Sequence, residues 1–359
     1  MLGEVRVAIA GVGNCASALV QGVQFYKDAR EDEKVSGLMH VNFGGYHVRD
    51  VRFVAAFDVN TQKIGKDLGE AIWVGGNRCA KFCDVTRLGV KVLPGPVLDG
   101  VASHMREPFD VYGSEVEPAN VVECLKEADA DMLVNFLPVG SFRASRVYAE
   151  ACLDAGCALV NCIPEFIASD ASWAKRFEAK GLPVAGDDVK SQLGATILHR
   201  NLVQLCLDRG VEVDETYQLN LGGNTDFLNM TVEERLKTKR ISKTEAVTSL
   251  VPYKVPTRIG PSDYVPFLGD KKICYVFLKG RKFGDMPVVV TVKLEVEDSP
   301  NSAGVVIDVV RAVKLALDRK VGGVLTSMCS YAFKHPPVQV PDSVAKQWVE
   351  EYIQQKRKT

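Results

Sequence analysis

The feature that most limits how this chain can fold is a glycine turn between a strand and a helix near its start. Residues 5–10 (VRVAIA) are an unbroken apolar run, residues 11–16 read GVGNCA, and residues 14–27 have the apolar pattern of a helix. This order predicts the first βαβ unit of a doubly wound α/β sheet, whose helix N-terminus presents free N–H groups to a phosphate. A purely structural glycine turn is the alternative.

The residues of this turn match the needs of a bound dinucleotide. Gly11 allows the sharp bend, Gly13 lets the backbone approach a pyrophosphate, and the small Ala16 lets helix and strand pack closely. Asn14 and Cys15, which open the predicted helix, complete the expected contacts.

A carboxylate follows the second apolar strand. The strand is predicted over residues 51–57 and ends at Asp58. An acid there bonds the ribose hydroxyls and repels a 2′-phosphate, so NAD is favoured over NADP. The intervening segment 27–50 makes the gap from the glycines longer than the usual value of about 20 residues. An ordinary strand-end cap is therefore the alternative for Asp58.

A polar loop follows the strand predicted over residues 132–136. Asn135, Pro138 and Ser141 lie in NFLPVGS, which a doubly wound topology places beside the cofactor. Plain turn chemistry explains the same residues equally well.

The pattern along the chain indicates two domains. The first half alternates continuous apolar strands with helices, as in a parallel sheet buried on both faces. After about residue 189 the alternating runs 211–221, 273–278 and 287–296 predict antiparallel strands. We expect a Rossmann-like domain over 1–189, completed by 311–359, and a second α+β catalytic and oligomerisation domain over 190–310.

The composition narrows the possible partners. The 44 basic and 45 acidic residues leave a formal charge of −1, which argues against nucleic acid or an anionic membrane as a general partner. No apolar run is long enough to span a membrane, and the start lacks a secretory pattern, so a cytoplasmic protein is expected. The ten cysteines form no C-x-x-C pair, and the five histidines have no zinc spacing.

Two acids and a lysine follow the fifth predicted strand, 183–186. Asp187, Asp188 and Lys190 lie in GDDVKS, at the carboxyl end of a strand, where α/β enzymes bind ligands. Either acid could instead cap the helix that begins near Ser191.

A dense polar segment follows the alternating strand that ends at Asn220. LGGNTDFLN (221–229) contains Asp226 and several amides that suit a sugar, although a turn would use the same residues.

Lysines in KTKRISK (237–243) give a sharper signal. If this segment is helical, Lys239 and Lys243 stand on one face, and two ammonium groups in one pocket repel, which lowers one pKa. Lysine suits phosphate binding and proton transfer. A solvated basic face or a nucleic-acid patch is the alternative. Asp298 in DSPNSAG and Lys334 in SYAFKHPP are weaker signals on their own.

In this order, these motifs resemble the myo-inositol-1-phosphate synthase family of the shorter prokaryotic type. The resemblance extends from VRVAIAGVGNCAS to SYAFKHPP, with GLMHV, GPSD and DSPNSAGVVID between them. It implies a Rossmann domain, a catalytic domain whose sheet supports a homotetramer, and tightly held NAD. It also implies the reaction: glucose 6-phosphate is oxidised at C5, C6 attacks the C1 aldehyde, and the hydride returns to C5.

The resemblance also implies a set of site residues. By motif these are Lys239, Lys243, Lys334, Asp187 or Asp188, Asn220, Asp226 and Asp298. We assign Lys239 or Lys334 to proton movement at C5, and Lys243 to stabilising an oxyanion or the phosphate. The family pattern places Asp188 and Lys190 among the cofactor contacts as well.

One departure from the family concerns charge. Eukaryotic relatives carry a lysine near the position of Asp263. Lys254, Lys271, Lys272 or a divalent metal cation held by Asp298 and the substrate phosphate would supply the missing charge. The sequence leaves these alternatives open.

Two other functions compete with this interpretation. An ordinary NAD-dependent dehydrogenase, similar in outline to homoserine dehydrogenase, needs only the glycine turn, Asp58 and one lysine, and it leaves LGGNTDFLN and the lysine pair unexplained. A non-catalytic NAD-binding sensor predicts cofactor binding without a product.

Overall fold

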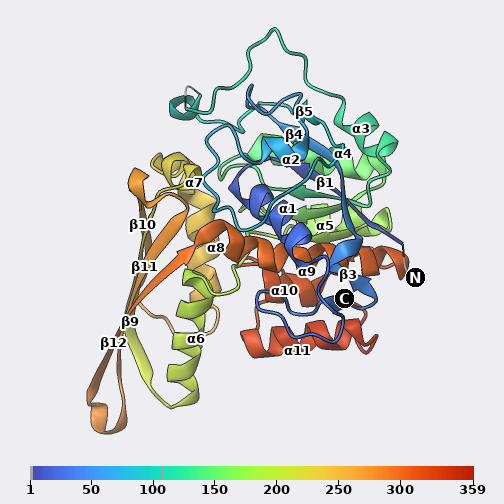
Figure 1. Ribbon diagram of the computed structural model, residues 1–359. Helices are drawn as coiled ribbons and strands as arrows, with labels where there is room; N and C mark the ends of the chain where they lie inside the picture. Colours follow the sequence, from blue (N-terminus) through green and yellow to red (C-terminus); the bar gives the residue numbers. More distant parts are fainter. Residues whose placement is uncertain (1–2, 107) are drawn as a thin grey trace.

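The parallel sheet predicted from the N-terminal strands is the core of the larger part of the molecule. The computed structural model describes residues 3–106 and 108–359 (Figure 1). Seven parallel strands lie in the order β13-β8-β7-β6-β1-β4-β5. Their bounds are β1 Val5–Ala10, β4 Val51–Asp58, β5 Val92–Pro94, β6 Met132–Asn135, β7 Ala158–Asn161, β8 Pro183–Ala185 and β13 Gly323–Val324. The doubly wound α/β class is confirmed.

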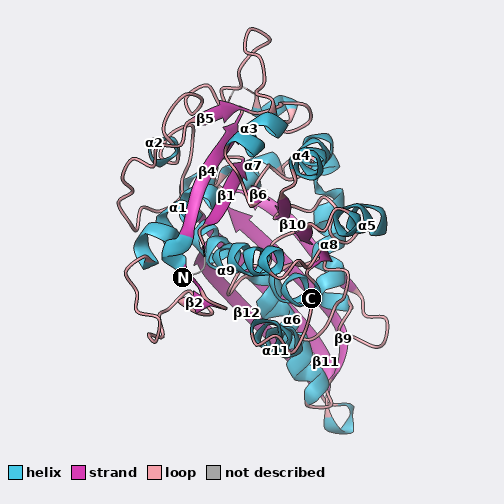
Figure 2. Cartoon of the chain, turned by 90° about the vertical axis from the view of Figure 1, so that its right-hand side faces the viewer, coloured by secondary structure: helices cyan, strands magenta, loops and turns pink. Residues whose placement is uncertain are grey.

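Helices cover both faces of this sheet because its strands are apolar on both sides. Figure 2 shows the two helical layers. One layer consists of α1 Asn14–Tyr26, α9 Asp298–Asp318, α10 Thr326–Ala332 and α11 Asp342–Ile353. The other consists of α3 Val121–Glu127, α4 Phe142–Ala155 and α5 Ala171–Ala179. Helices α9 and α10 thus pack on strands of the sheet, and α11 packs on α10.

Helix α9 begins at Asp298, the first residue of the motif DSPNSAG. Pro300 lies in the first turn, where a missing N–H has no helical partner to lose. The motif DSPNSAG is therefore the helix N-terminus itself rather than a loop before it.

The inserted segment 27–50 packs along α9. Its short hairpin pairs β2 Asn42–Phe43 with β3 Tyr46–His47. The buried Arg311 of α9 donates to the carbonyl of Val41 at 2.8 Å, and Asp308 accepts from the amide of Met39 at 3.2 Å. The insertion therefore leaves the sheet intact, and β4 still pairs with β1.

A four-stranded sheet forms the second layered part, in the order β10-β9-β11-β12. Its bounds are β9 Glu212–Gly222, β10 Thr257–Tyr264, β11 Lys271–Arg281 and β12 Pro287–Glu297. It is mixed, since β9 and β10 are parallel and the other pairs antiparallel. Helices α6 Ala195–Asp208 and α8 Lys237–Thr248 cover one face. Tyr217, Leu219 and Tyr275 are exposed on the other.

Among the described residues, no helix combines the length and the apolar character that a membrane crossing needs.

Candidate active site

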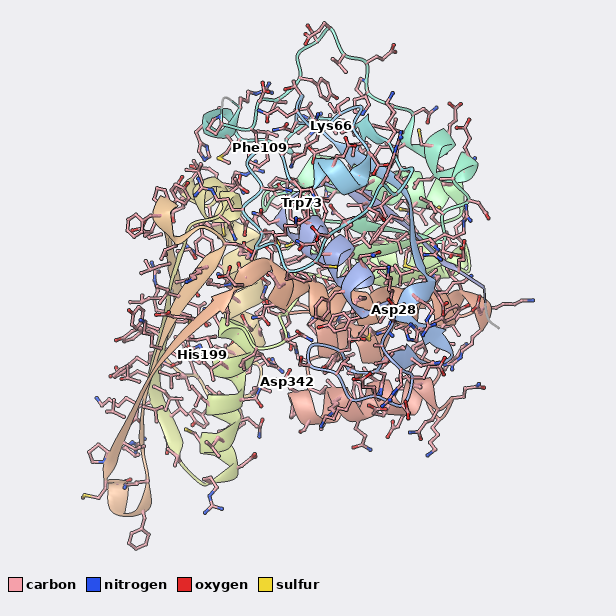
Figure 3. The ribbon with its side chains drawn as sticks, viewed as in Figure 1. Asp28, Lys66, Trp73, Phe109, His199 and Asp342 are labelled. Atoms are coloured by element: carbon pink, nitrogen blue, oxygen red, sulfur yellow. The ribbon has the colours of Figure 1, made fainter. Side chains whose placement is uncertain are left out.

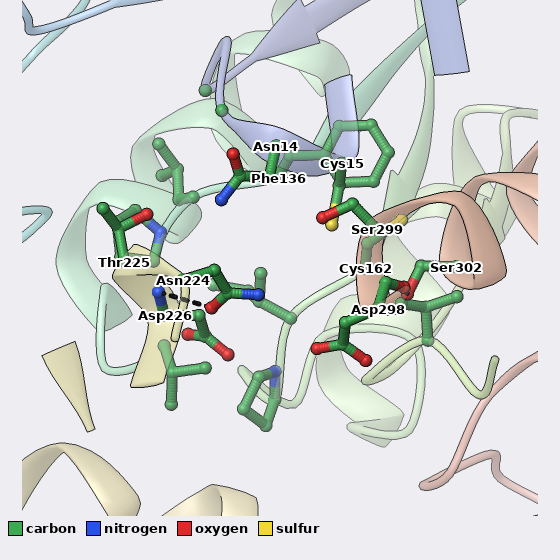
Figure 4. A pocket seen from close by; sticks show the side chains of 18 of the residues that line it. Asn14, Cys15, Phe136, Cys162, Asn224, Thr225, Asp226, Asp298, Ser299 and Ser302 are labelled. Carbon is green, nitrogen blue, oxygen red and sulfur yellow. Dashed lines mark hydrogen bonds between the residues drawn. The ribbon is translucent and has the colours of Figure 1, made fainter. Parts of the chain in front are cut away.

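A pocket lies at the carboxyl ends of β1, β4 and β6, and residues of the second sheet and its helices line its opposite side. In the close view of Figure 4, Asn14 and Cys15 at the start of α1 lie across the cavity from Asp226 and Asp298. Asp226 belongs to the short helix α7 Thr225–Asn229, and Asp298 opens α9. The pocket therefore joins motifs from both halves of the sequence.

The glycine turn forms one end of this pocket. Gly11 has a φ of +90°, and a Cβ added to it would lie 2.7 Å from the carbonyl oxygen of Phe136. By contrast, a Cβ on Gly13 would have no neighbouring atom within 4 Å, so the backbone there borders open space. A glycine that leaves such space at the N-terminus of a helix fits a pyrophosphate.

Asp58 lies beside this turn despite the long insertion. Its Oδ2 accepts from the amide of Val12 at 2.7 Å, and its Oδ1 accepts from the amides of Val59 and Asn60 at 2.8 and 2.9 Å. The carboxylate is buried and lines the pocket. Both the strand-end cap and the ribose contact considered for it are compatible with this position.

The opposite end of the pocket contains four lysines from three separate elements. Lys239 and Lys243 come from α8, Lys272 from the start of β11, and Lys334 from the segment after α10. The carboxylates of Asp188, Asp226 and Asp298 line the same pocket.

Asp188 is the anion at the centre of this group. It accepts from Lys334 Nζ at 2.8 Å and from the hydroxyl of Ser242, and Lys239 Nζ lies 3.8 Å away. Lys239 also lies 3.7 Å from Asp226, while Lys272 donates to Asp298 at 3.2 Å. Burial raises the pKa of the Asp188 carboxyl, but Lys334 and Lys239 outweigh it and hold the pKa below its usual range.

The pKa of Lys239 is raised. Burial lowers it, and the carboxylates of Asp188, Asp226 and Asp298 more than reverse that effect. This lysine is therefore a permanent cation at neutral pH.

Lys243 differs from Lys239 although both belong to α8. Burial, followed by repulsion from Lys272, Lys239 and Lys334, lowers the pKa of Lys243 to about 7. Burial likewise lowers the pKa of Lys334, which Asp188 partly offsets. The helical pair predicted from the sequence thus contains one fixed cation and one amine that can accept a proton near neutrality.

Backbone pairing explains how Lys334 reaches the pocket. The amide of Lys334 donates to the carbonyl of Asp188 at 2.8 Å, and the amide of Lys190 donates to the carbonyl of Ala332 at 2.7 Å. Val189 and Phe333 form the bridge between these bonds. The segment after α10 is therefore seated on the strand-end motif GDDVKS, which lies far from it in the sequence.

Several predicted site residues line the pocket and others lie behind it. Those that line it are Gly11, Gly13, Asn14, Cys15, Asp58, Pro138, Asp188, Asp226, Lys239, Lys243, Asp298 and Lys334. Those that do not are Ala16, Asn135, Ser141, Asp187, Lys190 and Asn220.

Asp187 is the clearest case of the second group. It is fully buried and accepts from Asn161 Nδ2 at 2.7 Å and from the amides of Ile167, Ala168 and Ser169 at 3.0, 3.1 and 2.9 Å. These bonds tie the end of β8 to the loop after β7. Between the two neighbouring acids, the structure therefore places Asp188, and not Asp187, in the pocket.

The remaining residues of this group make local contacts. Asn135 donates to Ser145 and Asn161 at 3.0 and 2.9 Å. The hydroxyl of Ser141 donates a hydrogen bond to the carbonyl of Pro138. Asn220 accepts from Gln218 at 2.9 Å within β9.

Lys190 faces away from the pocket and donates to Asp342 at 2.6 Å.

Lys272 is a candidate for the charge that the lysine of eukaryotic relatives would supply near Asp263. Of the three lysines considered as the missing cation, only Lys272 lines the pocket among the described residues. Side chains alternate along β11, so Lys271 points to solvent and Lys272 points into the pocket. The sequence alone does not show which of two adjacent lysines faces the pocket. Lys272 donates to Asp298, beside which the sequence also allowed a divalent metal cation.

Within residues 3–106 and 108–359, no cluster of three or more His, Cys, Asp or Glu side chains is suited to hold a metal ion.

The arrangement combines a dinucleotide cradle with a polar chamber. The chamber holds fixed cations for a phosphate or a developing oxyanion and one amine for proton transfer. Its acids, amides and lysines suit a phosphorylated sugar.

Comparisons with known proteins agree with this arrangement. A family model for myo-inositol-1-phosphate synthase matches residues 194–299. The chain is 54% identical to the inositol-3-phosphate synthase of Mycolicibacterium smegmatis, over 98% of both chains. It is also 54% identical to that of Corynebacterium glutamicum, over 97% of this chain and 98% of the relative.

Solved structures give the same fold. A myo-inositol-1-phosphate synthase-related protein from Thermotoga maritima has a TM-score of 0.84 at 25% identity, over 98% of both chains. The inositol-3-phosphate synthase of Caenorhabditis elegans has a TM-score of 0.76 at 16% identity, over 98% of this chain and 86% of that one, which is a likeness of fold alone.

Proposed function

The chain belongs to the myo-inositol-1-phosphate synthase family, and on this premise we propose that it converts D-glucose 6-phosphate to 1L-myo-inositol 1-phosphate in the pocket described above. It is an isomerase that uses NAD catalytically. The observation that supports this most directly is that the glycine turn and four lysines from three different elements line one pocket. A plain dehydrogenase has no use for so many cations.

The glycine-turn end of the pocket is where NAD would be held. Gly11, Gly13 and Asn14 would contact the pyrophosphate, and Asp58 the adenosine ribose. NAD held there would supply the hydride acceptor for oxidation at C5 and the hydride donor for the later reduction. The chain's own side chains must then move the protons and stabilise the negative oxygens.

The pKa values favour Lys243 as the group that takes the proton from the C5 hydroxyl. A base must be neutral before it acts, and Lys243 has a pKa of about 7 while that of Lys239 is raised. This differs from the roles assigned from the family resemblance, in which Lys239 or Lys334 moves the proton at C5 and Lys243 stabilises an oxyanion or the phosphate. The pKa of Lys334 is also lowered, so Lys334 remains a candidate for moving the proton at C5.

Lys239 then serves as a cation for the enolate at C5 and C6 and for the C1 alkoxide. Its ammonium is fixed by Asp188 and Asp226 and does not have to reorganise as negative charge develops. Lys272, paired with Asp298, is the second fixed cation and suits the substrate phosphate.

The decisive test is phosphorus and proton NMR of the purified chain incubated with glucose 6-phosphate and NAD, with NADH absorbance followed in parallel. An inositol monophosphate without accumulating NADH is the expected result. Accumulating NADH with an oxidised sugar would favour the dehydrogenase, and cofactor binding without a product would favour the sensor. Repeating the assay with a chelator and with added divalent metal asks whether a cation acts between Asp298 and the phosphate.

Replacing Lys239 should separate chemistry from cofactor binding. In Lys239→Ala, turnover should fall to background because the main fixed cation is lost, whereas NAD should bind as before because Lys239 lies at the opposite end of the pocket. Calorimetric titration with NAD and the NMR assay measure the two effects. Retained turnover would remove Lys239 from the mechanism.

We also propose that the open face of the second sheet is where a homotetramer assembles. Tyr217 stacks on Phe277 with ring centroids 4.8 Å apart, and Leu219 and Tyr275 are exposed beside them. An exposed apolar sheet face of this kind is typical of an association surface.

A further inference from the structure

Lys63 is a buried lysine at the glycine-turn end of the pocket that the proposed chemistry does not use. Its side chain is 1% exposed, and it lines the pocket together with Gly11, Gly13 and Asp58. No sequence motif singles it out, because it follows the strand β4 in an ordinary polar segment, VNTQK. A lysine is almost never fully buried without a partner or a purpose.

The contacts of Lys63 fix the turn that faces the dinucleotide. Its Nζ donates to the carbonyl of Val12 at 2.8 Å and to Asn77 Oδ1 at 3.0 Å. The amide of Val12 donates to Asp58 at 2.7 Å. Both polar groups of the residue between the two turn glycines are therefore held by side chains.

The hydrogen bond to the carbonyl of Val12 does not by itself account for a charged side chain at this position. The carbonyl of Val12 already accepts from Asn77 Nδ2 at 3.2 Å, so it is satisfied without Lys63. Burying a charge is costly, and here burial lowers the pKa of Lys63 while Asp58 opposes that effect. The ion pair with Asp58 compensates this charge in part, and it leaves the ammonium at the edge of the pocket.

The ammonium retains capacity for a ligand. Two of its three N–H groups donate to Val12 and Asn77. Asp58 Oδ2 lies 3.8 Å from Nζ, which is an ion pair but too long for a hydrogen bond. Within the described part of the chain, the third N–H is thus available beside Asp58, where the adenosine ribose is expected.

We propose that Lys63 binds the adenosine ribose next to Asp58, and that these two charges together decide between NAD and NADP. The inference rests on the proposed use of NAD at this pocket. With Asp58 ionised, the pair is neutral as a unit and the carboxylate repels a 2′-phosphate. Without the charge of Asp58, Lys63 becomes an uncompensated cation that suits a 2′-phosphate.

The first experiment compares NAD affinity of Lys63→Met with that of the unaltered chain, by calorimetric titration without substrate. The loss of a charged donor should weaken binding by about 10- to 100-fold. ADP-ribose, which keeps the adenosine ribose and lacks nicotinamide, should lose affinity by the same factor. Lys66→Met is the matched control, because Lys66 is an exposed lysine of the same segment (Figure 3), and it should bind NAD unchanged.

The second experiment tests the choice of cofactor. Asp58→Asn should gain measurable NADP binding, and the double variant Asp58→Asn with Lys63→Met should lose that gain. NADP binding that persists in the double variant, or that never appears in Asp58→Asn, would overturn the selectivity argument. Equal NAD affinity in Lys63→Met and the unaltered chain would overturn the ribose contact.

Two checks keep these outcomes clear. Lys63→Gln removes the charge and keeps a donor for Val12, so it replaces Lys63→Met if thermal unfolding shows that the latter does not fold. Failure of the unaltered chain to bind NAD would contradict the proposed function, whereas normal binding with no effect at Lys63 would contradict this inference alone.

Discussion

Asp187 and Asp188 are adjacent acids with opposite surroundings. Asp187 is held by backbone amides, and burial raises the pKa of its carboxyl, whereas lysines hold the pKa of Asp188 down. The sequence GDDVKS places both at a strand end and does not distinguish them. The distinction depends on the lysines of α8 and of the segment after α10, which only the folded chain brings to Asp188.

Matched amide variants should separate these two acids. Asp188→Asn should reduce turnover by at least about 100-fold, because Lys239 and Lys334 lose the anion that positions them. Asp187→Asn should instead lower the free energy of unfolding by about 1–3 kcal/mol, since an amide N–H₂ would face backbone donors. Turnover followed by NMR and the free energy of unfolding in urea should be measured for both variants. Equal effects of the two changes on both quantities would refute the distinction.

Turnover should depend on pH through Lys243. Its neutral form is populated above its pKa of about 7, so kcat should rise from pH 6 to pH 8. Lys243→Met should abolish turnover and flatten this dependence. A profile in the unaltered chain that falls over the same range would exclude Lys243 as the base.

Lys243 should also lower the free energy of unfolding, because its charged form is buried at an unfavourable position. An unfolded lysine has a pKa of about 10.4, so between about pH 7 and pH 10 the unfolded chain binds the extra proton and stability rises with pH. Lys243→Met should therefore raise the free energy of unfolding by about 1–4 kcal/mol below pH 7, with the gain shrinking towards pH 10. Urea unfolding at several pH values measures it, and a destabilised variant at pH 6 would contradict the argument.

Helix α11 is attached to the second part of the molecule through its first residue. Asp342 accepts from Lys190 Nζ at 2.6 Å and from Arg200 Nε at 2.9 Å. Figure 3 labels Asp342 where α11 approaches α6, which carries Arg200. Both cations are buried, so one carboxylate compensates two charges.

Removing that carboxylate should destabilise the fold strongly. Asp342→Asn should lower the free energy of unfolding by about 3–5 kcal/mol, because Lys190 and Arg200 remain buried without an anion. Glu350→Gln is the control on the same helix, since Glu350 pairs with His40 at the surface, and it should cost less than about 1 kcal/mol. Urea unfolding compares them; similar small losses would show that the Asp342 network contributes little.

The helices and strands were predicted with uneven success, for physical reasons. Strands β1, β4, β6 and β8 were predicted because each is a continuous apolar run that ends at glycine or polar residues. Strand β10 was missed, since TRIGPSDY contains a glycine and a proline that argue against a strand. In the pocket, motif order indicated the lysines of α8, whereas Lys63 and the inward direction of Lys272 depend on register and packing.

At the scale of the whole molecule, association between copies of the chain should depend on the open face of the four-stranded sheet. Leu219→Glu places a charge in the middle of that face and should shift the assembly towards smaller species, seen by light scattering after gel filtration. Lys175→Glu on the exposed side of α5 is the control and should leave the mass unchanged. An unaltered mass in Leu219→Glu would place the interface elsewhere.

The seating of Lys334 on GDDVKS has a consequence for how the molecule is made. A ribosome that adds about 5–20 residues per second reaches Lys334 roughly 15–60 seconds after it has made the glycine turn. During that interval the nascent chain already contains the glycine turn, but Asp188 has no Lys334 to pair with. The lysine-lined end of the pocket is therefore completed only late in synthesis, after the segment that carries Lys334 has been made.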